Sequence, residues 1–291
     1  MSTSGNRAST GTERDRTDHW PEIARLWRHI GPPLRPVAQD VRFYSDAVRE
    51  WVGLRGAPRA LLLGVTPELY RLPWPEGTDL LAVDRSQDMI DRVWPGPKDA
   101  ARCMSWLDLS LPGSSRDIVL CDGGLQLLAH PQGQRRLAHV LRGILSDGGL
   151  CVVRLYAPPA RRESPDAVLR DLLEGKIACM NLLKLRLGMS LMNAAAEGVE
   201  LGTIWRALHA AAPDLNELAA RIGWSAEHMS AIDPYRDSAV RYHFVTADQV
   251  SQMFCGDPGG FEVRRVSVPD YELGERCPTI VLQRRPRAST D

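Results

Sequence analysis

Short apolar runs recur through the first half of the chain, separated by polar or glycine-containing segments. Their residues are apolar at successive positions, not at alternate ones, as is typical of strands buried on both faces. One helical pattern, 137–145, is ended by Asp147-Gly148-Gly149. This order predicts a parallel sheet covered by helices on both sides. The predicted strands are 60–63, 80–83, 117–121 and 150–156, with a weaker one near 101–106.

A long helical stretch follows these strands. Ser164-Pro165 is a cap followed by proline at the first helical position. Helical spacing of apolar residues then continues to about Ile222. We expect breaks in it near Gly188, at 198–202 and at Pro213.

The two ends of the chain carry further elements. Apolar spacing predicts two amphipathic helices within 20–52, broken by the proline-rich segment 31–36. Thr246 and Gln249 have the spacing of a capping box, which predicts a helix through Phe254. Segments 261–268 and 279–282 are predicted strands. We therefore expect a disordered arm (1–17), an N-terminal helical segment (18–56), an α/β domain (57–160 and 244–285) and a helical insertion (161–243).

Composition excludes several classes of function. Lys plus Arg and Asp plus Glu both number 36 in 291 residues, which argues against binding to a nucleic acid backbone. The six cysteines have no metal-ligand spacing, so no metal site and no disulfide framework are expected. The most apolar stretch, 177–192, contains Lys184 and Arg186 and is too short to span a membrane. We expect a cytoplasmic protein.

The candidate chemistry begins at Gly64, which follows the apolar run 60–63. Asp84 ends the next apolar run, 20 positions after Gly64. An acid at this distance from a glycine turn is the usual partner of ribose hydroxyls, and ligands of parallel sheets bind beyond the carboxyl ends of the strands. The alternative is that Asp84 only caps the helix that contains Met89 and Ile90.

In its ordered set of motifs the chain resembles the class I S-adenosylmethionine-dependent methyltransferases. The matching pieces are the Gly64 turn, Asp84, Ser105-Trp106, the run 117–122 and the turn 145–150. The resemblance implies a Rossmann-like seven-stranded α/β sheet with N-terminal helices and a helical lid before the last two strands. It also implies S-adenosylmethionine as cofactor, held by Gly64, Val65, Thr66, Asp84, Arg85, Met89, Ser105, Trp106, Asp122 and Gly123.

The chain departs from the family pattern in two places. Only one glycine stands in the first loop, where the family commonly has three. Several glycines are needed most where a pyrophosphate approaches the backbone, and S-adenosylmethionine has no phosphate. Thr66 would cap a helix that begins with Pro67. Ser105 stands where the family often has an acid for the adenine amino group, and Trp106 either stacks on the adenine or is a core aromatic.

Methyl transfer from a sulfonium needs alignment, a dry site and, for some acceptors, a base. His243 and His130 are the candidate catalytic residues, and Tyr44, Tyr235 and Tyr242 are candidate substrate-binding groups. Surface or structural roles for the histidines are the alternative.

The insertion favours a small-molecule acceptor, because a lid of this size excludes water and encloses a small site. Its Met180, Met189, Met192, Trp205 and Trp224 would line an apolar acceptor pocket or form the core of the insertion itself. A non-catalytic binding or regulatory protein and an aminopropyl transferase are the alternative functions. The acceptor atom and a homodimer stay open.

Overall fold

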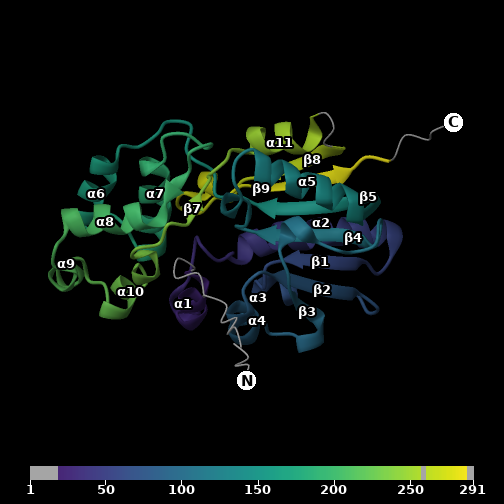
Figure 1. Ribbon diagram of the computed structural model, residues 1–291, viewed down its shortest axis with the longest axis horizontal. Coiled ribbons are helices and arrows are strands. Elements are labelled where there is room, and N and C mark those ends of the chain that lie inside the picture. The colour runs from purple at the N-terminus through teal and green to yellow at the C-terminus, as the bar shows by residue number, and fades with distance from the viewer. Residues whose placement is uncertain (1–18, 257–259, 287–291) are drawn as a thin grey trace, which may run out of the picture.

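The structure, a computed structural model, describes residues 19–256 and 260–286, and the predicted arm 1–17 lies outside them. Within these residues seven strands form one mixed sheet, in the order β3-β2-β1-β4-β5-β9-β8 (Figure 1). Strands β1 to β5 are parallel, whereas β9 is antiparallel to β5 and to β8. The predicted seven-stranded Rossmann-like sheet is confirmed. The strand bounds are β1 Arg59–Leu63, β2 Asp79–Asp84, β3 Ala101–Cys103, β4 Arg116–Asp122, β5 Leu145–Arg154, β8 Phe261–Ser267 and β9 Thr279–Arg284.

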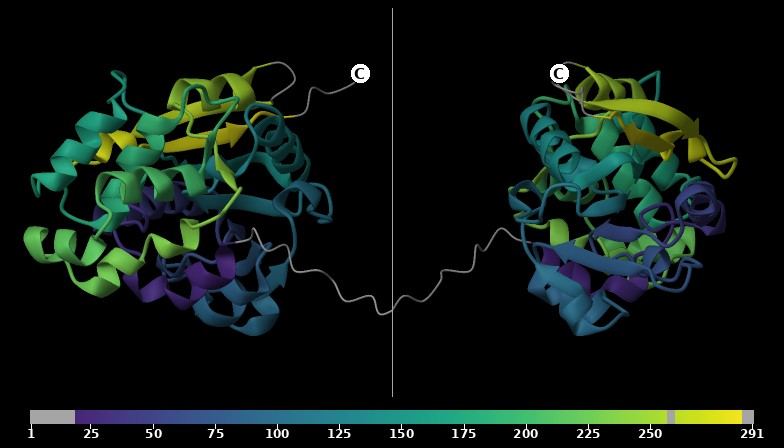
Figure 2. Two further views of the ribbon diagram at one scale, coloured as in Figure 1. Left: turned by 60° about the vertical axis from the view of Figure 1, so that its left-hand side comes forward. Right: turned by 90° about the vertical axis from the view of Figure 1, so that its right-hand side faces the viewer.

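Successive strand residues face two different helical layers. In β1, Leu61 and Leu63 pack in one cluster with α5 (Gln132–Ile144) and α11 (Ala247–Cys255). Leu62 packs in a second cluster with α2 (Ala38–Arg55) and α4 (Gln87–Val93). The sheet lies between these layers (Figures 1 and 2). The strands are apolar at successive positions because both of their faces are buried.

The N-terminal segment contains the two predicted helical pieces. Helix α1 (Trp20–Arg25) continues into a 3-10 turn, η1 (Trp27–His29), and the proline-rich segment then separates these from α2. Helix α11 is capped by Thr246, whose hydroxyl accepts from the Gln249 backbone N–H at 3.2 Å, as the capping box predicts. Shorter elements are α3 Pro67–Tyr70, η2 Lys98–Ala100, η3 Trp106–Asp108, η4 Leu125–Leu127 and η6 Gly274–Arg276.

The insertion lies to one side of the sheet and has its own hydrophobic core (Figure 1). The predicted break at Gly188 is wrong, because α7 runs through it. A Cβ there would lie 3.1 Å from Ile204 Cδ1, so the glycine allows close packing against α8. The break at Pro213 is confirmed. The helices are α6 Pro165–Leu173, α7 Met180–Leu191, α8 Leu201–Ala211, α9 Leu215–Ile222, α10 Ala226–Ser230 and the 3-10 turn η5 Asp233–Tyr235.

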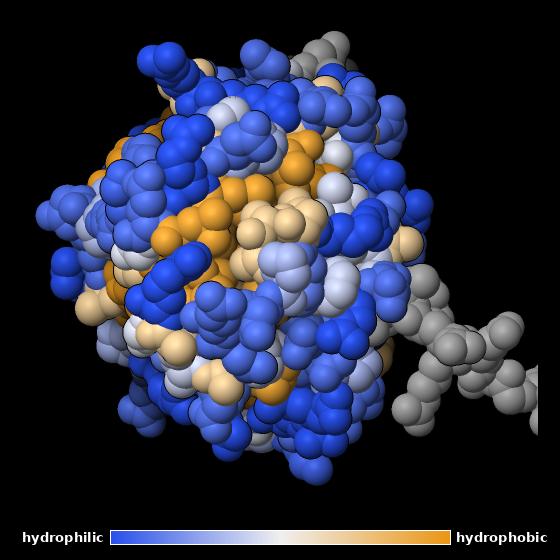
Figure 3. Space-filling view, turned by 90° about the vertical axis from the view of Figure 1, so that its left-hand side faces the viewer, coloured by the Kyte–Doolittle hydropathy of each residue, from blue (hydrophilic) through white to orange (hydrophobic). Residues whose placement is uncertain are grey.

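A small antiparallel pair closes the insertion. Strand β6 (Val199–Glu200) pairs with β7 (Arg241–Tyr242), and the sequence pattern predicted neither strand. The insertion side of the molecule shows apolar surface gathered in a hollow that polar side chains surround (Figure 3). No helix within 19–256 and 260–286 combines the length and the apolar character needed to cross a bilayer.

Asp117, at the start of β4, joins three strands. Its carboxylate accepts hydrogen bonds from the backbone and guanidinium of Arg59 on β1 and from the hydroxyl of Ser146 on β5, at 2.7–2.9 Å. Burial by itself raises the pKa of Asp117, but these hydrogen bonds outweigh it and lower the pKa to about 2.

Replacement of this acid tests its contribution to stability. Asp117→Asn should lower the free energy of unfolding at pH 7 by about 1–3 kcal/mol, because charged hydrogen bonds are lost. The wild-type contribution is present above pH 4 and disappears as the pH falls through 2, so urea unfolding of the variant should lack this acid-dependent loss. Asp79→Asn, at a largely exposed partner of Arg116, is the control and should change stability by less than about 1 kcal/mol. Equal pH profiles for Asp117→Asn and wild type would refute the assignment.

Candidate functional site

A cavity of about 360 Å³ lies at the carboxyl ends of β1, β2 and β4. Strand order reverses at β1, because β2 and β3 lie on one side of it and β4 and β5 on the other. This is the position at which open α/β sheets bind ligands. The sheet contributes to its lining Leu63, Gly64, Val65, Thr66, Asp84, Arg85, Met89, Ser105, Trp106, Leu107, Asp122, Gly123 and Gly124. All ten residues that the resemblance implies for the cofactor are therefore at one cavity.

Gly64, Asp84 and Trp106 form one corner of this cavity. The backbone of Gly64 has φ +95°, a conformation that favours glycine. A Cβ at Gly64 would lie 3.8 Å from Trp106 Cζ2 and 4.0 Å from Asp84 Oδ2, so it would enter the space between them. The Trp106 indole N–H donates to the Val83 carbonyl at 2.8 Å, which fixes the ring. Trp106 both lines the cavity and packs against the sheet core.

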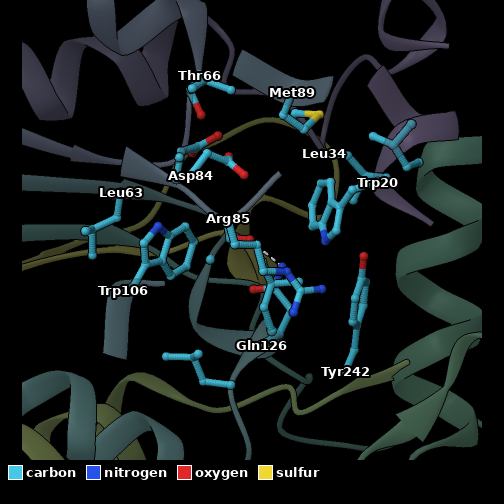
Figure 4. Close-up of a pocket in the computed structure, with 18 of the residues that line it drawn as sticks. Trp20, Leu34, Leu63, Thr66, Asp84, Arg85, Met89, Trp106, Gln126 and Tyr242 are labelled. Atoms are coloured by element: carbon cyan, nitrogen blue, oxygen red, sulfur yellow. Dashed lines mark hydrogen bonds between the residues drawn. The ribbon is translucent and has the colours of Figure 1, made fainter. Parts of the chain in front are cut away.

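At one helix start the alternative considered for Asp84 is wrong, and at another the predicted cap at Thr66 is absent. Asp84 does not cap α4; that cap is Ser86, whose hydroxyl accepts from Met89 N, while Asp84 Oδ1 accepts from Ser86 N at 2.8 Å. Pro67 is the first residue of α3, but the Thr66 side chain makes no capping hydrogen bond. Thr66 instead lines the cavity near Asp84, opposite Trp20 and Tyr242 (Figure 4).

Asp122, at the end of β4, is held by a buried arginine. Arg154 Nε and Nη2 donate to the two Asp122 carboxylate oxygens at 2.5 and 3.1 Å, and the Arg154 side chain is fully buried. Arg154 Nη1 donates to the Pro33 carbonyl at 2.8 Å. Burial by itself lowers the pKa of Arg154, but the Asp122 charge raises it well above its ordinary value. The Asp122 carboxylate is therefore held in one place by the buried guanidinium.

Gly123 follows this pair with φ +57°. A Cβ there would lie 2.6 Å from the hydroxyl of Tyr156. The same hydroxyl donates to the Leu34 carbonyl at 2.9 Å, so Tyr156 is fixed. Gly123 thus keeps the cavity open beside Tyr156, which also lines it.

The structure places three of the predicted residues away from the cavity lining. His243 is buried, with Nδ1 2.7 Å from the Ala195 carbonyl oxygen. His130 Nδ1 lies 2.8 Å from Gln134 Oε1. Tyr44 is fully buried behind β4 and β5, where its hydroxyl donates to the Cys121 carbonyl and accepts from Arg154 N. None of the three is among the residues that line the cavity.

Tyr235 and Tyr242 of the insertion do line the cavity, as predicted. The N-terminal segment, the segment after β4, the end of β5 and the insertion contribute further residues that sequence reasoning missed. For Lys184 the available signal is a charge within an apolar stretch. The residues missed are Trp20, Ile23, Trp27, Ile30, Leu34, Leu63, Leu107, Gly124, Gln126, Leu127, Leu128, Ala129, Gly133, Tyr156 and Lys184.

The methionines and tryptophans expected at an acceptor pocket lie elsewhere. Met180, Met189 and Met192 are buried in the core of the insertion, and Trp205 and Trp224 pack against that core. Trp205 also stacks on His209, with ring centroids 3.6 Å apart. The structure thus favours the alternative that these side chains stabilise the insertion.

Several solved structures have folds similar to that of this chain. A Rhodobacter sphaeroides protein, provisionally described as a Zn-dependent alcohol dehydrogenase, matches with a TM-score of 0.54 and 14% identity, over 90% of this chain and 98% of that chain. The CurJ carbon methyltransferase matches with a TM-score of 0.50 and 11% identity, over 84% of this chain and 54% of that chain. The N-methyltransferase NodS from Bradyrhizobium japonicum, solved with S-adenosyl-L-homocysteine, matches with a TM-score of 0.48 and 11% identity, over 90% of this chain and 97% of that chain.

At these identities the likeness concerns the fold alone. No protein-family model and no curated protein matches the sequence. The strand order is typical of class I S-adenosylmethionine-dependent methyltransferases, so the chain has their fold and the predicted resemblance is confirmed at that level. In the described parts of the chain, no three His, Cys, Asp or Glu side chains are grouped to hold a metal ion.

A substitution at Gly123 tests the fit at Tyr156. Gly123→Ala should lower the free energy of unfolding by about 2–4 kcal/mol, from backbone strain and from overpacking. Gly53→Ala in α2 is the matched control, because its Cβ meets nothing within 4 Å, and it should leave stability unchanged or raise it by up to about 1 kcal/mol. Thermal unfolding measures both. Equal effects of the two variants would contradict the packing described.

A substitution at Arg154 tests the buried ion pair. Arg154→Met should cost about 3–5 kcal/mol, because it leaves the Asp122 carboxylate buried without its partner. Arg265→Met, at a partly exposed pair with Glu50, should cost less than about 1 kcal/mol. Urea unfolding distinguishes the two. A loss below about 1 kcal/mol for Arg154→Met would show that Asp122 does not depend on it.

Proposed function

We propose that this protein is an S-adenosylmethionine-dependent methyltransferase that acts on a small-molecule acceptor. The single observation that carries the proposal is the meeting of Gly64, Asp84, Trp106 and Gly123 at one cavity beyond the carboxyl ends of the parallel strands. These residues end or follow four different strands, β1, β2, β3 and β4. A sheet that needed only stability would not require them to share a space.

The residues present fit the proposed cofactor. Asp84 at the end of β2 would accept the ribose hydroxyls. Gly64 leaves room beside Asp84 and Trp106 that any side chain would fill, and the methionine tail would pass there. The fixed ring of Trp106 would contact the adenine.

When bound, the cofactor supplies a methyl group on a positive sulfonium. The chain's own residues align the acceptor and exclude water. Gly123 and Tyr156 shape the space at the end of β4, and Asp122 is held by Arg154, which leaves the Asp122 carboxylate without a role as base. The size of the cavity and its cover of N-terminal and insertion residues support a small acceptor over a macromolecule.

Asp84 offers the sharpest test of the cofactor assignment. Calorimetric titration of wild type with S-adenosylhomocysteine should give saturable binding. Asp84→Asn should weaken it tenfold or more, about 1.5–3 kcal/mol, because a charged hydrogen-bond acceptor is lost. Asp88→Asn, at an exposed acid of the neighbouring helix, should bind as wild type does.

Two outcomes would contradict different parts of the proposal. If wild type shows no binding at millimolar S-adenosylmethionine or S-adenosylhomocysteine, the cofactor is wrong. If both variants bind equally well, Asp84 does not hold the ribose.

A further inference from the structure

Four charged residues line the described part of the cavity, and they have different partners. Among the described lining residues the acids are Asp84 and Asp122, and the bases are Arg85 and Lys184. Asp122 is paired with Arg154, and Asp84 and Arg85 are among the residues that the resemblance implies for the cofactor. Beyond the cofactor, the charged side chain that remains in the described lining is that of Lys184.

The Lys184 side chain is deeply buried. It lies on α7 and is 3% exposed. Its Nζ donates a hydrogen bond to the Ala231 carbonyl and lies 4.7 Å from the ring centroid of Tyr235. No Asp or Glu of the described residues forms an ion pair with it. Burial lowers the pKa of Lys184 to about 7, although the Asp233 charge opposes this shift.

Aromatic rings form much of the cavity wall. Trp20, Trp27, Tyr156, Tyr235 and Tyr242 all line the cavity. The Arg85 side chain extends from beside Asp84 toward Trp20 and Tyr242 (Figure 4). Aromatic walls bind flat apolar molecules and also bind cations. A cationic acceptor is disfavoured here, because the charged form of Lys184 would repel it.

We propose that the acceptor is a flat, largely apolar molecule with one carboxylate, and that Lys184 binds this carboxylate. The inference rests on the proposed function, because it assigns the remaining part of the same cavity. A carboxylate supplies the partner that the buried amine lacks within the described residues, and charge-assisted hydrogen bonds of this kind are strong. It also offsets the positive sulfonium that the cofactor would bring.

The neighbours of Lys184 allow its charge to be followed by pH. The titratable and charged groups near Lys184 are His19, Tyr235 and Asp233, and Tyr242 and Arg85 line the same cavity. Burial lowers the pKa of His19 to about 3, raises that of Tyr242 to about 12 and raises that of Tyr235 well above its ordinary value. These three groups stay neutral between pH 6 and 8.5, whereas Lys184 loses its charge above about pH 7. Carboxylate binding should therefore weaken as the pH rises through 7.

A pair of probes of equal shape tests the proposal. With wild type saturated by S-adenosylhomocysteine, the dissociation constants of 2-naphthoate and 2-naphthamide are measured by calorimetry at pH 6 and 8.5. At pH 6 naphthoate should bind at least about tenfold more tightly than naphthamide. The affinity for naphthoate should be lower at pH 8.5 than at pH 6. Titration at pH 8 in buffers of different ionisation enthalpy should show uptake of up to about one proton with naphthoate only.

Variants separate Lys184 from a structural role. Lys184→Met keeps the volume and should abolish both the preference for naphthoate and the proton uptake, while S-adenosylhomocysteine binds as in wild type. Lys176→Met, at an exposed lysine paired with Glu174, is the control and should keep both properties.

The outcomes distinguish the two proposals. A wild type that binds S-adenosylhomocysteine but binds naphthamide as tightly as naphthoate, or binds no naphthoate at millimolar concentration, overturns the role of Lys184. Unchanged preference in Lys184→Met overturns it as well. A wild type that does not bind S-adenosylhomocysteine overturns the proposed function, and the acceptor assignment with it.

Discussion

The buried pair of Arg154 and Asp122 is the interaction on which the arrangement of the cavity depends. A guanidinium with no exposed surface must have its charge and its donors satisfied by partners inside the protein. Its partners come from the end of β4 and, through the Pro33 carbonyl, from the N-terminal segment. One side chain therefore fixes both the turn at Gly123 and the chain that covers it.

The two halves of the cavity have different origins. The sheet half is formed by loops that leave the rigid sheet, where backbone hydrogen bonds such as that from Gly64 N to the Val83 carbonyl set the positions. The covering half is formed by α1, η1 and the insertion, which has a separate hydrophobic core. The methionines and tryptophans of the insertion belong to that core or pack against it, whereas Lys184, Tyr235 and Tyr242 line the cavity.

Electrostatics follows this division. On the sheet side, acids at strand ends are either paired, as at Asp122, or turned toward the space beside Gly64, as at Asp84. On the covering side the charged lining residue is Lys184, and much of the wall is aromatic. The predicted histidines are not among the lining residues, since His243 lies against the Ala195 carbonyl and His130 is beside Gln134.

The sequence by itself determined the strands of the sheet, the capping box at Thr246 and the spacing of Gly64 and Asp84. These features are local, because burial on two faces, a helix cap and a glycine turn each depend on a few neighbouring residues. Only the tertiary structure decided that Tyr44 supports the sheet, that β6 pairs with β7 and that Lys184 reaches the cavity. The partner of a buried polar group is supplied by a segment far away in the chain, as Cys121 is for Tyr44 and Ala231 for Lys184. No local pattern encodes such a meeting, because it follows from the packing of the whole chain.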